Sequence, residues 1–134
     1  MENFEKKSTH QKERHGCVTA WLILMIIVNS IAALFYFLLL YSRNEFQPQL
    51  QIPDSILVIL GVFSVFNVIF SFLLFNWKKI GFTGFAFTAL IVFFINMYMG
   101  LAITQSIMGL LGIAILYAIL QIKNDDVSTW ENLE

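Results

Sequence analysis

Three side chains near the start of the chain belong to types that commonly bind metal ions. His10, His15 and Cys17 lie close together, with Glu13 between them. Zinc sites need four ligands at characteristic spacings, and this spacing matches no standard zinc pattern. We therefore expect no metal site and no cofactor, and interpret the segment as a solvated tail. Acylation of Cys17 is the alternative for that residue.

Catalytic motifs are absent from the rest of the sequence. HExxH, GxSxG, Walker A and CxxC patterns do not occur. We therefore predict that the protein is not an enzyme and has no catalytic residues. An enzyme acting on lipids is the remaining enzymatic hypothesis, and the sequence offers it no nucleophile–base pair.

Charged residues divide the chain into long uncharged stretches. No Asp, Glu, Lys or Arg lies within 15–42, 55–77 or 80–122. A membrane-spanning helix needs about 20 apolar residues to cross roughly 30 Å of hydrocarbon. The first two stretches each predict one such helix. The third would be about 65 Å long as a single helix, so it must fold back on itself, and Gly100–Gln105 is the expected turn.

These stretches predict an all-α fold, an integral membrane four-helix bundle that runs up-down-up-down. The whole chain, 1–134, is then a single transmembrane domain with short tails at 1–16 and 123–134. Strands are disfavoured because strict apolar/polar alternation is missing, and a cleaved signal peptide because the first apolar run is too long. The expected spans are 18–41, 55–77, 81–99 and 103–122.

Composition and charge distribution indicate the location. The chain is 58% hydrophobic and 13% charged, with a mean hydropathy of +0.75, whereas soluble domains carry about 25% charged residues. Seven of the eight basic residues fall on the side that holds both tails, which predicts that both termini are cytoplasmic. The net charge of −1 disfavours nucleic acid as a partner.

Small and polar residues form stripes along the predicted helices. Between helices surrounded by lipid, contacts depend on close approach and on interhelical hydrogen bonds, so such residues mark packed faces. Phenylalanines of the second helix lie mostly outside its stripe and are expected to face lipid: Phe63, Phe66, Phe70 and Phe72. The packing residues, which are also the candidates for a cavity lining, are Asn29, Ser64, Asn67, Ser71, Gly84, Thr88, Asn96, Ser106, Gly109 and Gly112.

Two functional hypotheses follow from the stripes. The first is a non-enzymatic protein that acts by helix packing, as a homo-oligomer or as an accessory subunit of a larger membrane protein. The alternative is a passive channel or small-solute transporter whose polar cavity is lined by Asn29, Asn67 and Asn96. Coupled transport is disfavoured because no ionisable carboxylate, Lys, Arg or His lies inside a span.

The last twelve residues carry a local helix signal. Ser128 and Glu131 have the spacing of a capping box. Trp130 and Leu133 would form an apolar edge on one helical turn, which we expect to lie on the membrane surface or to dock a partner.

Several segments together resemble a family of uncharacterised small four-span bacterial inner-membrane proteins with no assigned function. The segments are Trp77-Lys78-Lys79-Ile80-Gly81-Phe82-Thr83-Gly84-Phe85, Ile115-Leu116-Tyr117, Leu120-Gln121-Ile122-Lys123 and Ser128-Thr129-Trp130-Glu131-Asn132-Leu133-Glu134. The likeness covers the chain from Gly16 onward. It implies a bacterial plasma membrane, and it implies no catalytic residue.

Overall fold

The computed structural model describes residues 14–46, 52–124 and 126–134. Over these residues the prediction of four helices long and apolar enough to cross a membrane is confirmed. They are α1 (Gly16–Phe46), α2 (Asp54–Phe75), α3 (Ile80–Tyr98) and α4 (Ile103–Leu120).

Six helix ends differ from their predicted positions by one or two residues and the end of α1 differs by five, and two of these differences have a clear physical reason. α1 continues to Phe46, beyond the predicted 41, because backbone hydrogen bonding does not stop where the apolar residues stop. α2 ends at Phe75, before the predicted 77, because Trp77 adopts a left-handed backbone with φ of 64°. α2 begins at Asp54, with Pro53 as its N-cap residue.

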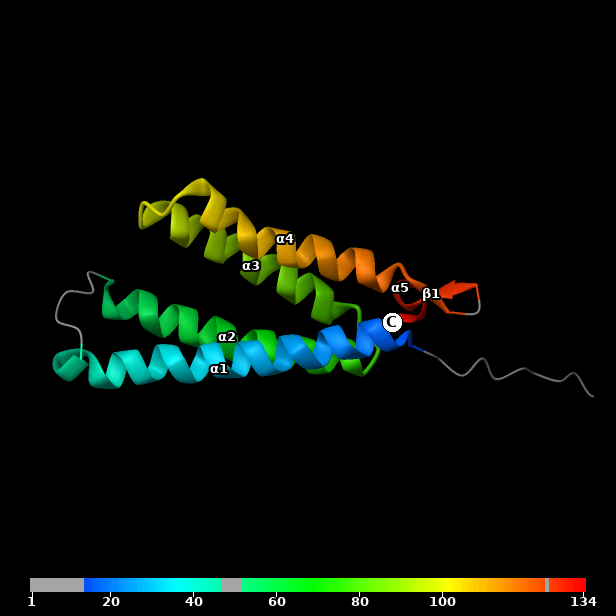
Figure 1. Ribbon diagram of the computed structural model, residues 1–134, viewed down its shortest axis with the longest axis horizontal. Helices are drawn as coiled ribbons and strands as arrows, with labels where there is room; N and C mark the ends of the chain where they lie inside the picture. Colours follow the sequence, from blue (N-terminus) through cyan, green and yellow to red (C-terminus); the bar gives the residue numbers. More distant parts are fainter. Residues whose placement is uncertain (1–13, 47–51, 125) are drawn as a thin grey trace, which may run out of the picture.

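The helices form two pairs, and Figure 1 shows α1 beside α2 and α3 beside α4. The pairs are close together at the end where α1 begins and α2 ends, and they diverge toward the other end. We call the first the closed end and the second, where α1 and α3 finish, the open end. The main hydrophobic cluster lies at the closed end and draws on all four helices: Val18, Leu22, Leu74, Phe85, Leu116, Leu120 and Leu133.

Most of the apolar surface of these helices is not covered by the chain itself. Between 11% and 28% of the residues in each helix's apolar window are buried. A helix that is hydrophobic all round belongs in a protein core or in a membrane. Because so little of this surface is packed inside the molecule, lipid is the environment that suits it.

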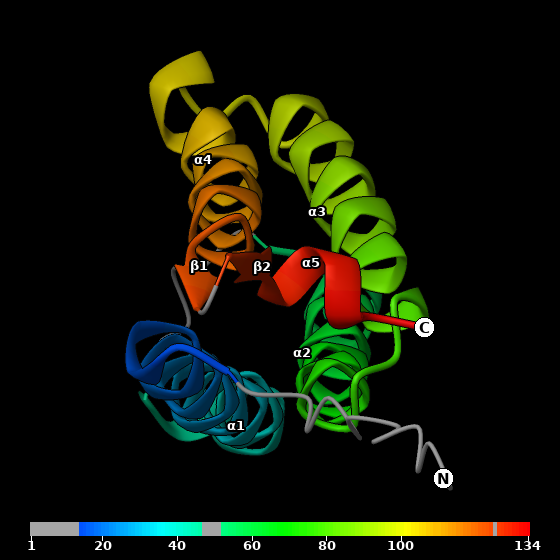
Figure 2. The ribbon, with the colours of Figure 1, turned by 90° about the vertical axis from the view of Figure 1, so that its right-hand side faces the viewer.

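The segment after α4 folds back across the closed end. It contains a two-residue antiparallel hairpin, β1 (Lys123–Asn124) with β2 (Val127–Ser128), and a short helix, α5 (Thr129–Asn132). We call this segment, described over 123–124 and 126–134, the strap. Figure 2 shows α5 crossing the end of the bundle. The sequence did not predict the hairpin.

Candidate functional site

A buried hydrogen bond joins α2 to α3 near their middles. The Thr88 hydroxyl donates to Oδ1 of Asn67 at 2.7 Å, and only 4% of Thr88 is exposed. Two serines on the same face of α2 are also buried, but each donates to a carbonyl of its own helix: Ser64 to Leu60 and Ser71 to Asn67, both at 2.9 Å. The predicted polar face of α2 is therefore packed, and its hydroxyls are satisfied.

The closest approach of α2 and α3 depends on two glycines. A Cβ at Gly81 would lie 2.5 Å from the Phe70 carbonyl oxygen and 2.9 Å from the Leu74 nitrogen. A Cβ at Gly84 would overlap the Phe70 ring. We expected Phe70 to face lipid, and this expectation is wrong. Its half-buried ring covers Gly84 and meets the Phe85 ring edge-on, because α3 presents no side chain at that point.

The three asparagines do not converge on one site. In the described part of the chain, only the Asn67 side chain bonds to another helix. The Asn29 amide donates to the Met25 carbonyl of its own helix at 2.8 Å. Asn96 is half-buried in the last turn of α3, and its backbone carbonyl accepts the bond from Leu101 that ends the helix.

The small residues of α4 divide into covered and uncovered positions. Ser106 is buried, and its hydroxyl lies 3.3 Å from the Ala102 carbonyl oxygen of the same helix. Among the described residues, no atom of another element lies within 4 Å of the position a Cβ would take at Gly109 or Gly112. The chain itself therefore fills the space beside the glycines of α3 and leaves the space beside those of α4 open.

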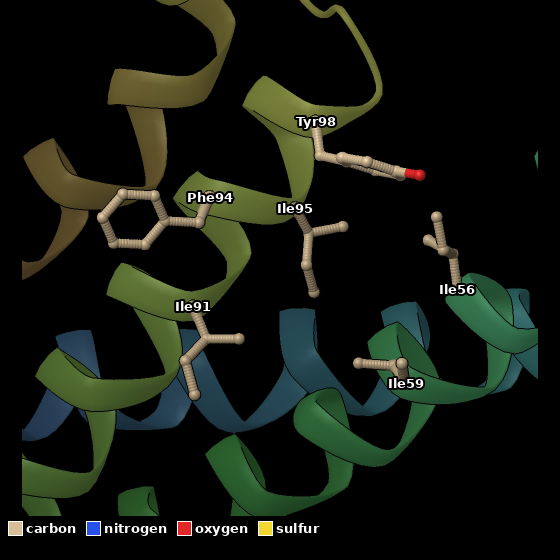
Figure 3. A pocket seen from close by; sticks show the side chains of 6 residues that line it. All are labelled: Ile56, Ile59, Ile91, Phe94, Ile95 and Tyr98. Atoms are coloured by element: carbon tan, nitrogen blue, oxygen red, sulfur yellow. The ribbon is translucent and has the colours of Figure 1, made fainter.

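Two grooves between helices are lined by apolar or small side chains. One, of about 450 Å³, lies between α2 and α3 toward the open end (Figure 3). Figure 3 shows Ile56 and Ile59 facing Ile91 and Ile95 across the gap, with Tyr98 reaching over its rim. The other, of about 470 Å³, lies between α1 and α2. Neither groove is lined by Asn29, Asn67 or Asn96, so neither is the polar cavity of the channel hypothesis.

Arg14 forms an arrangement at the closed end that the sequence analysis missed. Its guanidinium donates to the carbonyl oxygens of Phe75 at 2.7 Å and Leu74 at 3.2 Å, which end α2. It also stacks 4.3 Å from the centre of the Trp77 ring. Positive charge is favourable at a helix C-terminus. Burial lowers the pKa of Arg14 from its ordinary value, through the cost of removing the guanidinium from water.

Trp77 is the residue that reverses the chain after α2. Its N–H donates to the Leu74 carbonyl, and the Lys78 N–H donates to the Leu73 carbonyl at 2.8 Å. These two bonds define a Schellman motif, in which the left-handed position is usually glycine. A bulky residue there is a backbone outlier. No sequence signal marks Trp77 as left-handed, since only its contacts hold it there.

The strap confirms one prediction and corrects another. The capping box is present: the Ser128 hydroxyl accepts from the Glu131 N–H, and the Glu131 carboxylate accepts from the Ser128 N–H at 2.8 Å. The backbone hydrogen bond from Ser128 lowers the pKa of Glu131. We expected Trp130 and Leu133 to lie on the membrane surface or to dock a partner. They pack on this chain's own closed end, because the cluster there leaves an apolar surface that they cover.

The metal-binding residue types of the N-terminal segment, for which we expect no metal site, lie partly outside the described residues, which do not include His10 or Glu13. His15 stands just before α1, and its Nδ1 accepts a hydrogen bond from the Cys17 N–H at 3.2 Å. Cys17 is exposed. This arrangement caps a helix N-terminus.

These features define a class of protein: a helical protein with four membrane-length apolar helices, tied together at one end. Comparison of the chain with models of protein families, with curated proteins and with solved structures found no match.

Proposed function

We propose that this chain is a non-enzymatic multi-pass protein of the bacterial plasma (inner) membrane that acts by helix packing. Its helices cross the bilayer up-down-up-down with both termini on the cytoplasmic side. It assembles with copies of itself or as an accessory subunit of a larger membrane protein. The bias of basic residues toward the closed end supports this orientation.

The open space beside Gly109 and Gly112 is the observation that carries the proposal. Small residues on membrane helices let another helix approach closely. The glycines of α3 serve that purpose inside the chain, against Phe70 and Leu74. Within the part of the chain that the structure describes, those of α4 have no such neighbour, and the adjoining Met108 and Leu111 are 68% and 49% exposed. A helix from outside this chain fits that face.

The test measures the molar mass of the purified protein in mild detergent by light scattering. We expect an oligomer, or a complex with a co-purified membrane protein, that Gly109→Leu dissociates. Ala114→Leu is the matched control, because Ala114 is also exposed on α4 but lies about 140–160° around the helix from both glycines. A wild-type monomer with no partner in a native pull-down contradicts the proposal, as does equal dissociation by both variants.

A further inference from the structure

The strap joins elements that are distant in the sequence. It leaves the end of α4 and returns to the turn between α2 and α3, where Glu134 bonds on both sides. The Glu134 N–H donates to the Trp77 carbonyl, and the Lys79 N–H donates to the Glu134 carbonyl, both at 2.7 Å. Leu133 beside it is 8% exposed and belongs to the closed-end cluster. The strap is therefore bound through its backbone and through a buried side chain.

Trp130 is the second attachment of the strap, and it contacts both helices of the α3–α4 pair. Its ring meets Phe82 of α3 edge-on at 5.1 Å and Tyr117 of α4 at 5.2 Å between ring centres. The Lys79 ammonium lies 4.4 Å from the centre of the same ring. One side chain thus contacts α3, α4 and the turn that follows α2.

The same contacts hold the backbone of Trp77 in a strained conformation. Left-handed backbone costs a residue with a side chain roughly 1–2 kcal/mol. Trp77 keeps this conformation while its carbonyl accepts from Glu134 and its ring stacks under Arg14. Strain of this kind persists only where the surroundings impose it, and it concentrates at parts of proteins that switch.

The strap has little stability of its own. A two-stranded hairpin in water is marginal, and a four-residue helix cannot sustain itself without packing. Its ion pair, Lys78 with Glu134 at 3.6 Å, is more than half exposed on both sides and so contributes little. Segments of this kind open at a lower free energy than the whole molecule unfolds.

We propose that the strap is a releasable clasp that sets the angle between the α1–α2 pair and the α3–α4 pair. The pairs meet at the closed end and as far as the Asn67–Thr88 bond near the middles of α2 and α3, and they diverge beyond it (Figure 1). From this bond, α2 and α3 extend about 15–20 Å to the open end. A rotation of about 15° about this junction therefore moves the open end by about 5 Å and changes the width of the apolar groove between α2 and α3.

The test uses the full chain in nanodiscs with Cys17 replaced by Ser and spin labels at Ser55 and Leu101, on either side of the open end. The release variant combines Trp130→Ala with Leu133→Asp, and Asp126→Asn, at an exposed hairpin position, is the control. Hydrogen exchange of the Lys79 and Glu134 amides reports whether the strap has detached. We expect fast exchange in the release variant together with a shift or broadening of the label distance of about 5 Å.

Three outcomes overturn the proposal. Fast exchange at an unchanged label distance shows that the strap does not set the angle. Protected amides in the release variant show that these contacts do not hold the strap. An equal change in the Asp126→Asn control shows that the effect is not specific. A label pair at Tyr41 and Ser55, within the first helix pair, detects general unfolding. If that distance also changes, the double variant is replaced by Leu133→Ala. The same two measurements, amide exchange and the distance between the labels at Ser55 and Leu101, then decide whether the proposal holds.

Discussion

At each end of the bundle a Schellman motif reverses the chain, but the residue in the left-handed position differs between the two ends. At the open end the Schellman motif after α3 has Gly100 in the left-handed position, with φ of 75° and nothing within 4 Å of a would-be Cβ. At the closed end the motif after α2 places Trp77 there, between Arg14 and the strap. Glycine makes the first turn possible through local freedom, whereas tertiary contacts impose the second.

The difference extends to packing. The closed end has the main cluster and the strap, while Tyr41 and Tyr98 near the open end are 91% and 87% exposed. Exposed aromatic rings suit the headgroup level of a bilayer. The fold is therefore fixed at one end, and the arrangement of the other end follows from it. Substitutions at the two ends should therefore have unequal effects.

The largest effect is expected from Gly81→Leu. Its side chain would meet backbone atoms of Phe70 and Leu74, which cannot move aside without separating α2 from α3. Overpacking typically costs 1–3 kcal/mol, and a clash with backbone should cost about 3 kcal/mol or more. Unfolding by titration with denaturing detergent, followed by circular dichroism, measures it. Gly109→Leu, which meets no atom of this chain, should leave the monomer's stability unchanged; equal losses would contradict the structure.

Arg14→Ala should have the next largest effect. It removes two hydrogen bonds from a charged donor to the last carbonyls of α2 and the stacking on Trp77. Hydrogen bonds to charged groups contribute about 1.5–3 kcal/mol, so we expect a loss of about 2 kcal/mol in the same assay. Arg14→Lys should recover only part of it, since an ammonium lacks the planar fork. Full recovery would show that charge alone matters.

The two Schellman turns, at Gly100 and Trp77, give a paired prediction of about 1 kcal/mol. Gly100→Ala should destabilise by that amount, because alanine is strained at a φ of 75°. Trp77→Gly should destabilise the wild type, where the ring has contacts, but stabilise the Arg14→Ala variant, where strain outweighs them. A double-mutant cycle measures this change of sign. Additive effects would mean that Arg14 does not hold Trp77.

Thr88→Val tests the middle of the molecule, between the two ends. Losing the bond to Asn67 should cost about 0.6 kcal/mol, the average for interhelical hydrogen bonds in membranes.

Liposome flux of small solutes should be the same for wild type and Asn67→Leu. A solute flux that wild type supports and Asn67→Leu abolishes would favour the passive channel instead.

The smallest expected effect is a pH dependence confined to the strap. Because Glu131 has a lowered pKa in the folded strap, its ionised form stabilises the capping box. This contribution is complete above the ordinary pKa of 4.5 and is lost as the pH falls through the lower folded value. The protection of the Glu131 amide against exchange, measured relative to the unstructured rate at the same pH, should therefore fall on acidification. Glu131→Gln, which cannot ionise, should remove the dependence, and an unchanged profile would contradict it.

The sequence alone determined the four helices and the capping box. Burial of apolar side chains in lipid depends on the local run of residues, and a capping box on two residues three apart, so both can be read without knowing the fold. The turn at Gly100 was predictable for the same reason, since glycine marks a left-handed position by itself.

Only the tertiary structure decided which small residues are used inside the chain. Gly84 and Gly109 look alike in the sequence, yet one lies under the Phe70 ring and the other beside open space. The docking of the strap and the left-handed Trp77 depend on contacts between residues far apart in the chain, such as Arg14 with Phe75 or Glu134 with Lys79. Such contacts are set by how the helices come together in space, which local patterns along the chain do not specify.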